Sequence, residues 1–118
     1  MKENLNQLHE ILSELSDPSL ETALLTNDQV EKFNQAKIHS QNLNPWFTET
    51  NIEKAISGLA EITRPEAVKQ WIDNYELDKA QGLKIGLVLA GNIPLVGFHD
   101  ILSVLIAGHK PMVKLSSQ

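Results

Sequence analysis

The hydrophobic pattern of residues 83–118 limits the fold of this 118-residue chain more than any other feature. Residues 83–90, LKIGLVLA, form a nearly continuous apolar run rich in branched side chains, which is typical of a strand covered on both faces. Residues 97–108 are apolar almost all round, which favours a helix packed on a sheet, and Gly108 can close that helix in a left-handed cap. Residues 111–116, PMVKLS, predict a second strand.

This strand–helix–strand run has the length of a right-handed βαβ unit, about 30 residues. The run is preceded by a segment of different character, because residues 1–80 follow a helical period. We therefore expect an α/β fold, in which an N-terminal helical segment, residues 1–80, precedes one βαβ unit of a Rossmann-like parallel sheet within residues 81–118. Together they make one domain-sized chain.

Turn and capping residues divide the N-terminal segment into five expected helices. The first carries an apolar stripe of leucines and an isoleucine, and a short second helix is expected at Pro18. The third is capped within residues 26–28 and is expected to bury Val30, Phe33 and Ile38. The fourth has Thr48 as N-cap, with Phe47 packed on Ile52, and ends near Ile62. The fifth is opened by a capping box at residues 63–66, with Pro65 in its first turn, and carries on one face Val68, Trp71, Ile72 and Tyr75. The aromatic residues Trp46, Trp71 and Phe33 are expected as core anchors.

Charge divides the chain at the same place as the hydrophobic pattern. Residues 1–80 carry 7 Lys and Arg against 14 Asp and Glu, whereas residues 81–118 carry 3 Lys against 1 Asp. The net charge of -5 argues against a nucleic-acid partner, because phosphate binding needs clustered Lys and Arg. The N-terminal residues lack the apolar core of a signal peptide, and the apolar runs are too interrupted for a membrane span, so we expect a cytoplasmic protein.

The chain contains no cysteine, which excludes a disulfide framework, a thiolate zinc site and a cysteine nucleophile within these residues. No metal site is predicted. A dinucleotide fingerprint is also absent, because the segment AGNIPLVG has only the two glycines Gly91 and Gly97. His99, Asp100 and Ser103 share one helix face, but the partners of a hydrolytic triad come from separate elements, so we interpret them as a polar stripe.

The turn after the first strand is the best candidate for function. In open parallel sheets, ligands bind beyond the carboxyl ends of the strands, where the turns and helix N-termini point their amides outward. Asn92 lies in that turn, and Lys114 lies near the end of the second strand. Position alone identifies no ligand, and Asn92 could also serve only to cap the turn.

Residues 83–117 resemble the cofactor-binding segment of the aldehyde dehydrogenase superfamily, and more closely the acyl-CoA reductases related to the fatty-acid reductase of bacterial bioluminescence. Several ordered positions match: Asn92, Pro94 and Leu95 in the turn, Ala107-Gly108 at the helix end, and Lys114 and Ser116 in the second strand. The segment NPWFT, residues 44–48, also resembles the helical lead-in of these reductases. The resemblance implies that residues 81–118 begin a dinucleotide-binding α/β domain.

The resemblance also implies a cofactor and its contacts. Gly91 stands where the superfamily usually has Trp, and Ser117 stands where many members have a Glu that holds the adenosine ribose. Loss of that carboxylate removes a repulsion against a 2′-phosphate, which favours NADPH, with NADH as the alternative. By the same resemblance, Gly91, Lys114, Ser116 and Ser117 contact the cofactor, and Lys114 binds the adenosine ribose or its phosphate.

The activity that the resemblance implies is the reduction of a fatty acyl thioester, carried by coenzyme A or by a protein, to an aldehyde. In the family a cysteine thiolate holds the acyl group, and the nicotinamide delivers hydride. Asn92 matches the residue that donates its amide to the oxyanion. Because the chain lacks the nucleophile, we expect an N-terminal fragment of such an enzyme, with enough exposed apolar surface to self-associate. The alternative is a non-catalytic helical interaction module that binds no cofactor.

Overall fold

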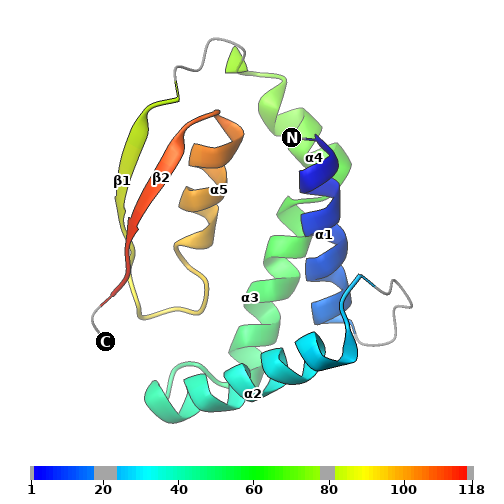
Figure 1. Cartoon of the computed structure of the whole chain (residues 1–118), viewed down its shortest axis with the longest axis vertical. Helices are drawn as coiled ribbons and strands as arrows, with labels where there is room; N and C mark the ends of the chain where they lie inside the picture. The colour runs from blue at the N-terminus through cyan, green and yellow to red at the C-terminus, as the bar shows by residue number, and fades with distance from the viewer. Residues whose placement is uncertain (1, 18–23, 78–81, 117–118) are drawn as a thin grey trace.

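The computed structural model describes residues 2–17, 24–77 and 82–116, so the short helix expected at Pro18 lies outside the described residues. Within them the chain is α/β, with five helices and a two-stranded parallel sheet. No helix in this part of the chain is both long and apolar enough to cross a membrane. The elements are α1 (Lys2–Ser16), α2 (Asn27–Leu43), α3 (Glu49–Ile62), α4 (Pro65–Ile72), β1 (Lys84–Val88), α5 (Phe98–Ile106) and β2 (Lys110–Lys114) (Figure 1).

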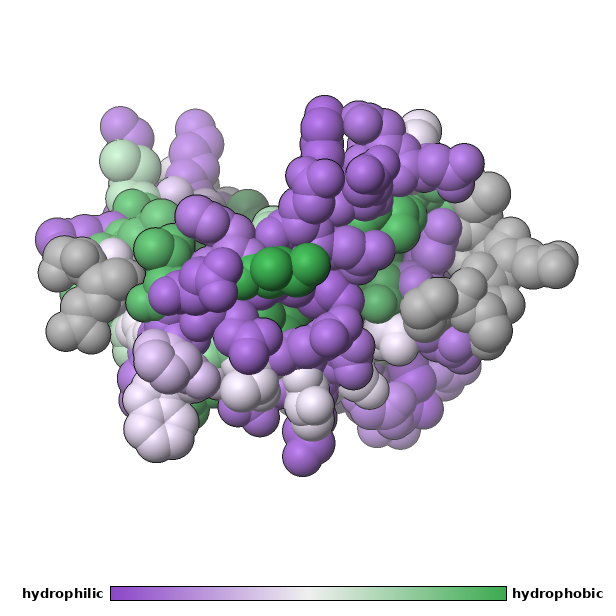
Figure 2. Space-filling view, turned by 90° about the horizontal axis from the view of Figure 1, so that it is seen from below, coloured by the Kyte–Doolittle hydropathy of each residue, from purple (hydrophilic) through white to green (hydrophobic). Residues whose placement is uncertain are grey.

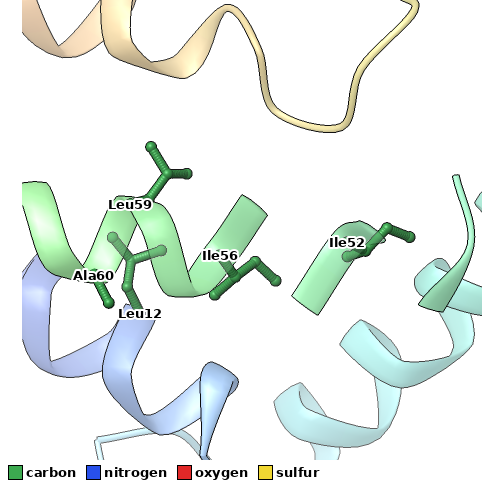
Figure 3. Close-up of a cluster of buried hydrophobic side chains, with 5 residues drawn as sticks. All are labelled: Leu12, Ile52, Ile56, Leu59 and Ala60. Atoms are coloured by element: carbon green, nitrogen blue, oxygen red, sulfur yellow. The ribbon is translucent and has the colours of Figure 1, made fainter. Parts of the chain in front are cut away.

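The helices α1 and α3 run side by side and hold the main core (Figure 1). Leu12 of α1 packs there against a row of α3 side chains at helical spacing, and Figure 3 shows this cluster: Leu12, Ile52, Ile56, Leu59 and Ala60. Thr48 caps α3 by accepting a hydrogen bond from the Asn51 amide, as expected, and Phe47 packs against the cluster that contains Ile52. The predicted apolar stripe of α1 therefore packs in the core, and the predicted cap at Thr48 begins the helix that it packs against.

The helix α2 begins as predicted but buries less than predicted. Thr26 and Gln29 form a reciprocal capping box at its N-terminus. No residue of α2 is fully buried: Val30 and Phe33 are half-buried, and Ile38 is 66% exposed. The prediction of a buried face is thus wrong at Ile38, because α2 lies across the end of the α1–α3 pair and reaches its core through Phe33 (Figure 1).

The helix α4 begins with Pro65 in its first turn, as predicted, but the capping box expected at residues 63–66 is wrong. Its N-cap is Arg64, which makes no side-chain cap hydrogen bond. Thr63 is 1% exposed and ends α3 instead, because its hydroxyl donates to the carbonyl of Leu59 at 2.8 Å. Val68 is buried and Trp71 is half-buried, whereas Tyr75 lies beyond the helix and is 63% exposed, so the expectation that it shares the packed face is also wrong.

The predicted βαβ unit is present. β1 pairs with β2 in parallel, with Lys84 opposite Lys110 and Val88 opposite Lys114, and both strands are a little shorter than expected. α5 packs between the sheet and the α1–α3 pair (Figure 1), and its residues Leu102 and Ile106 form a second buried cluster with Leu5 and Val68. The whole unit is therefore anchored on the helical segment.

Gly108 ends α5 in the left-handed conformation, at φ 83°, as predicted. Its N–H donates to the carbonyl of Leu105, and the N–H of His109 donates to that of Val104. These are the two hydrogen bonds of a Schellman motif, which turns the chain back into β2.

The described residues cover the sheet on one face, whereas the sequence predicted cover on both. Ile85 and Leu87 of β1 are half-buried on the side of α5, whereas the alternate residues Lys84, Gly86 and Val88 are exposed. Val88 is 82% exposed, since nothing in the described residues packs over it. The continuous apolar run indicates a strand that can be buried on both faces. The described residues bury only one of these faces.

Candidate functional site

The carboxyl ends of the two strands meet at the start of the turn that follows β1. The N–H of Leu89 donates to the carbonyl of Lys114 at 3.0 Å, which extends the pairing one residue beyond β1. Gly91 then lies directly against Ser116: a Cβ added to Gly91 would lie 2.5 Å from the Ser116 Cβ. A residue larger than glycine does not fit there without moving the end of the second strand.

The turn itself is tightly wound. The carbonyl of Ile93 accepts from the Val96 N–H, and that of Leu95 accepts from the Phe98 N–H. Leu95 has φ 57°, a left-handed conformation that costs a non-glycine residue about 1–2 kcal/mol. Gly97 lets the start of α5 approach β1, because a Cβ at this position would lie 2.6 Å from a methyl group of Leu89. Strain of this kind is tolerated where surrounding contacts hold the backbone in place.

Asn44 ties the segment after α2 to this turn. Its Nδ2 donates to the carbonyl of Gly91 at 3.2 Å, and its Oδ1 accepts from the N–H of Trp46 at 3.0 Å. The second bond is an Asx turn, which an Asn two residues before the bonded N–H makes readily. Asn51 completes the connection by donating its Nδ2 to the carbonyl of Trp46 at 2.8 Å. The backbone of Trp46 is thereby fixed at both its N–H and its carbonyl.

Trp46 is 72% exposed, so the expectation that it anchors the core is wrong. Its neighbour Phe47 occupies the core position instead. The other two expected anchors do pack on buried clusters, Phe33 on that of α1 and α3, and Trp71 on that of Leu102. The sequence interpretation also passed over Asn44, although the Asn-Pro-Trp order is a recognisable signal for an Asx turn.

Residues of the turn line two hollows. One has a volume of about 510 Å³ and is lined mainly by apolar side chains of the end of α2, the turn and α5, together with Gly91 and Ser116. The other has a volume of about 400 Å³ and is lined by residues that include Trp46, Lys54 and Asn92. Figure 2 looks at the molecule from this end and shows hydrophobic surface beside the hydrophilic side chains.

The residues predicted to form one site are distributed around these hollows. Gly91 and Ser116 are in contact, Asn92 lines the other hollow, and Ser117 lies outside the described residues. Lys114 is exposed at the end of β2, opposite Val88, so it lies on the sheet face away from α5. The structure therefore places Asn92, Gly91, Lys114 and Ser116 at one edge of the sheet but not in one cavity.

Residues 99–103 carry no hydrolytic triad. The Ser103 hydroxyl donates to the backbone carbonyl of His99 at 2.8 Å, and the His99 ring stacks on Trp71 with their centroids 5.3 Å apart. The interpretation of a polar stripe on α5 agrees with these contacts. Within the described part of the chain, no three His, Cys, Asp or Glu side chains gather as a metal site would require.

Lys69 of α4, whose pKa is shifted, lies away from this edge of the sheet. The Lys69 ammonium donates a hydrogen bond to Asp73 at 2.8 Å, and this bond, with the attraction between the two charges, raises the pKa of Lys69. The helix α4, which carries Lys69, lies at the other end of the molecule from the turn (Figure 1).

Comparison with protein-family models, with curated proteins and with solved structures finds no match to the chain. The structural contribution to any assignment of function is therefore the geometry of the turn after β1.

Proposed function

We propose that this chain is the N-terminal part of an NADPH-dependent acyl-CoA reductase, which reduces a fatty acyl thioester to an aldehyde. In this proposal residues 81–118 begin a Rossmann-like cofactor domain, and residues 1–80 are its helical lead-in. The observation that carries it is the meeting of the turn and the end of β2 at one sheet edge, through the hydrogen bond from Leu89 to Lys114 and the contact of Gly91 with Ser116.

Asn92 supplies the chemistry that the proposal needs from this chain. It is exposed in the turn, and among the described residues its carboxamide has no hydrogen-bond partner, so its N–H groups are free to face a substrate. A carbonyl oxygen that gains negative charge during acyl transfer is stabilised by such a donor by about 3 kcal/mol. The thiolate that attacks the carbonyl has to come from outside these 118 residues, since the chain contains no cysteine.

The residues at the sheet edge fit a phosphorylated dinucleotide in their donor set. Lys114 offers an exposed ammonium for a phosphate or ribose oxygen, Ser116 offers a hydroxyl, and residues 110–116 contain no carboxylate to repel a 2′-phosphate. The neighbouring hollow of about 510 Å³ is apolar enough to accept a planar base. When bound, NADPH would supply the hydride.

A direct test is NADPH affinity, measured by calorimetry on the chain and on the variant Lys114→Ala. We expect NADPH to bind, to bind more tightly than NADH, and to lose about tenfold in affinity in the variant, because one charge-assisted contact to phosphate is removed. The matched control is Lys110→Ala, which removes an exposed lysine from the opposite end of the same strand. Equal affinities for all three proteins would contradict the assignment of Lys114.

The alternative proposal, a helical interaction module without cofactor binding, is favoured by one observation. α2 has no fully buried residue and leaves Ile38 and Leu43 66% and 73% exposed. Apolar side chains on an unburied helix suit a protein partner. Absence of NADPH binding to the wild-type chain would favour this alternative.

A further inference from the structure

The backbone of Trp46 is hydrogen-bonded at both its N–H and its carbonyl, although its side chain is exposed. Its N–H donates to Asn44 at 3.0 Å, its carbonyl accepts from Asn51 at 2.8 Å, and Asn44 is in turn bound to the carbonyl of Gly91 at 3.2 Å. Yet the residue is 72% exposed, so these bonds do not serve to bury its indole. They fix the backbone of Trp46 beside the turn that carries Asn92.

The hollow at Trp46 combines three kinds of chemistry. Its lining includes an aromatic residue, Trp46, a cationic residue, Lys54, and an amide residue, Asn92, together with the apolar residues Ala55 and Pro94. Lys54 is exposed and forms no ion pair with any of the residues that the structure describes. Its charge is therefore available to a ligand.

We propose that this hollow binds one nucleotide, with its heteroaromatic ring stacked on Trp46 and its phosphate bound by Lys54. Aromatic side chains stack on bases without requiring a particular base, and a lysine binds phosphate as a point charge. Asn92 donates to or accepts from the polar edge of the ring or sugar. The volume of about 400 Å³ is at the lower end of the range for ligand sites, which fits a single nucleotide rather than a whole dinucleotide.

The source of the nucleotide, unlike the site itself, rests on the proposed function. Two ligands of that reaction contain a ring linked to phosphate: the nicotinamide half of NADPH and the nucleotide half of coenzyme A. Nicotinamide mononucleotide and adenosine 3′,5′-bisphosphate represent these halves and can be titrated separately. Binding of the first alone assigns the hollow to the cofactor, and binding of the second alone assigns it to the thioester.

The chain offers a direct optical test, because it contains only two tryptophans. The variant Trp71→Phe keeps an aromatic ring beside His99 and leaves Trp46 as the only indole. We expect at least one of the two nucleotides to quench the Trp46 emission of this variant in a saturable way. The further change Lys54→Glu should weaken that binding at least tenfold, and the same probe with inorganic phosphate alone should give no quenching.

The matched control for charge is Lys110→Glu in the same background, since Lys110 is also exposed and lies at the amino end of β2. Binding within twofold of the parent is expected there. Saturable quenching by neither nucleotide would overturn the proposal, and so would equal weakening by Lys54→Glu and Lys110→Glu. Calorimetry on Trp46→Leu adds a second check, because unchanged affinity would show that the indole makes no contact.

The nucleotide site and the proposed function can be overturned separately. If the wild-type chain binds no NADPH while a nucleotide still quenches Trp46 in a Lys54-dependent way, the reductase proposal falls and the nucleotide site stands. If NADPH binding depends on Lys114 but neither nucleotide reaches Trp46, the reverse holds.

Discussion

At the scale of single residues, the turn after β1 is built from residues whose size is dictated by their neighbours. Gly91 has no room for a side chain because Ser116 lies against it, and Gly97 has none because Leu89 does. Gly91, which the resemblance predicts to contact the cofactor, also has a packing role, and its carbonyl accepts a hydrogen bond from Asn44. The shape of the turn therefore depends on close packing of the backbone at these two glycines.

Replacement of Gly91 by alanine tests this packing. The new Cβ would lie 2.5 Å from the Ser116 Cβ, which is fixed to the backbone, so the end of the second strand has to move. We expect Gly91→Ala to lower the free energy of unfolding by about 1–3 kcal/mol, measured by urea denaturation. The control is Gly58→Ala on α3, where a Cβ meets nothing within 4 Å and should raise stability by up to about 1 kcal/mol. Equal effects of the two changes would contradict the contact.

At the scale of the elements, α2 differs from the other helices in how it is held. Its N-terminus has a complete capping box, but none of its residues is fully buried, whereas α3 buries Ile52, Ile56, Leu59 and Ala60. Local hydrogen bonds start α2, and tertiary packing does little to hold it.

This difference predicts the order of local opening in hydrogen exchange. Helices with few buried contacts open at lower free energy than helices in the core, so the amides of α2 should exchange faster than those of α1 and α3. Thr26→Ala, which removes the cap, should increase exchange in α2 by roughly fivefold, equivalent to about 1 kcal/mol, and leave α3 unchanged. Protection of α2 equal to that of α3 would show that packing contributes more to α2 than its exposure indicates.

The elements also show which features the sequence could predict. The βαβ unit, the caps at Thr26 and Thr48 and the left-handed Gly108 were predicted, because period and capping are local properties. The capping box at Thr63 was wrong because the same hydroxyl can bond backward to Leu59, and sequence does not choose between the two directions.

Burial could not be predicted in the same way. Trp46 and Ile38 lie in apolar patterns but are 72% and 66% exposed, because burial depends on which elements pack against them. For the same reason, Asn92 and Lys114 were predicted at the correct edge of the sheet, but their different surroundings were not. Asn92 lines a hollow, whereas Lys114 lies opposite Val88 on the exposed face of the sheet.

At the scale of the whole molecule, the helical segment and the βαβ unit are joined through α5, whose Leu102 and Ile106 pack with Leu5 and Val68. None of the residues that the structure describes covers the other face of the sheet, where Val88 is 82% and Met112 57% exposed. Parallel sheets are normally covered on both faces, so this surface agrees with the proposal that the chain works within a larger assembly, by self-association or with further protein. The hollows at the carboxyl edge remain accessible in this arrangement.

If this edge of the sheet is a nucleotide site, NADPH added to the labelled chain should change the amide chemical shifts of the residues there. We expect the changes to concentrate in residues 89–97, in residues 114–116 and around Trp46, with small changes in α1 and α4. Saturable changes confined to other surfaces, or no saturable change at all, would contradict it.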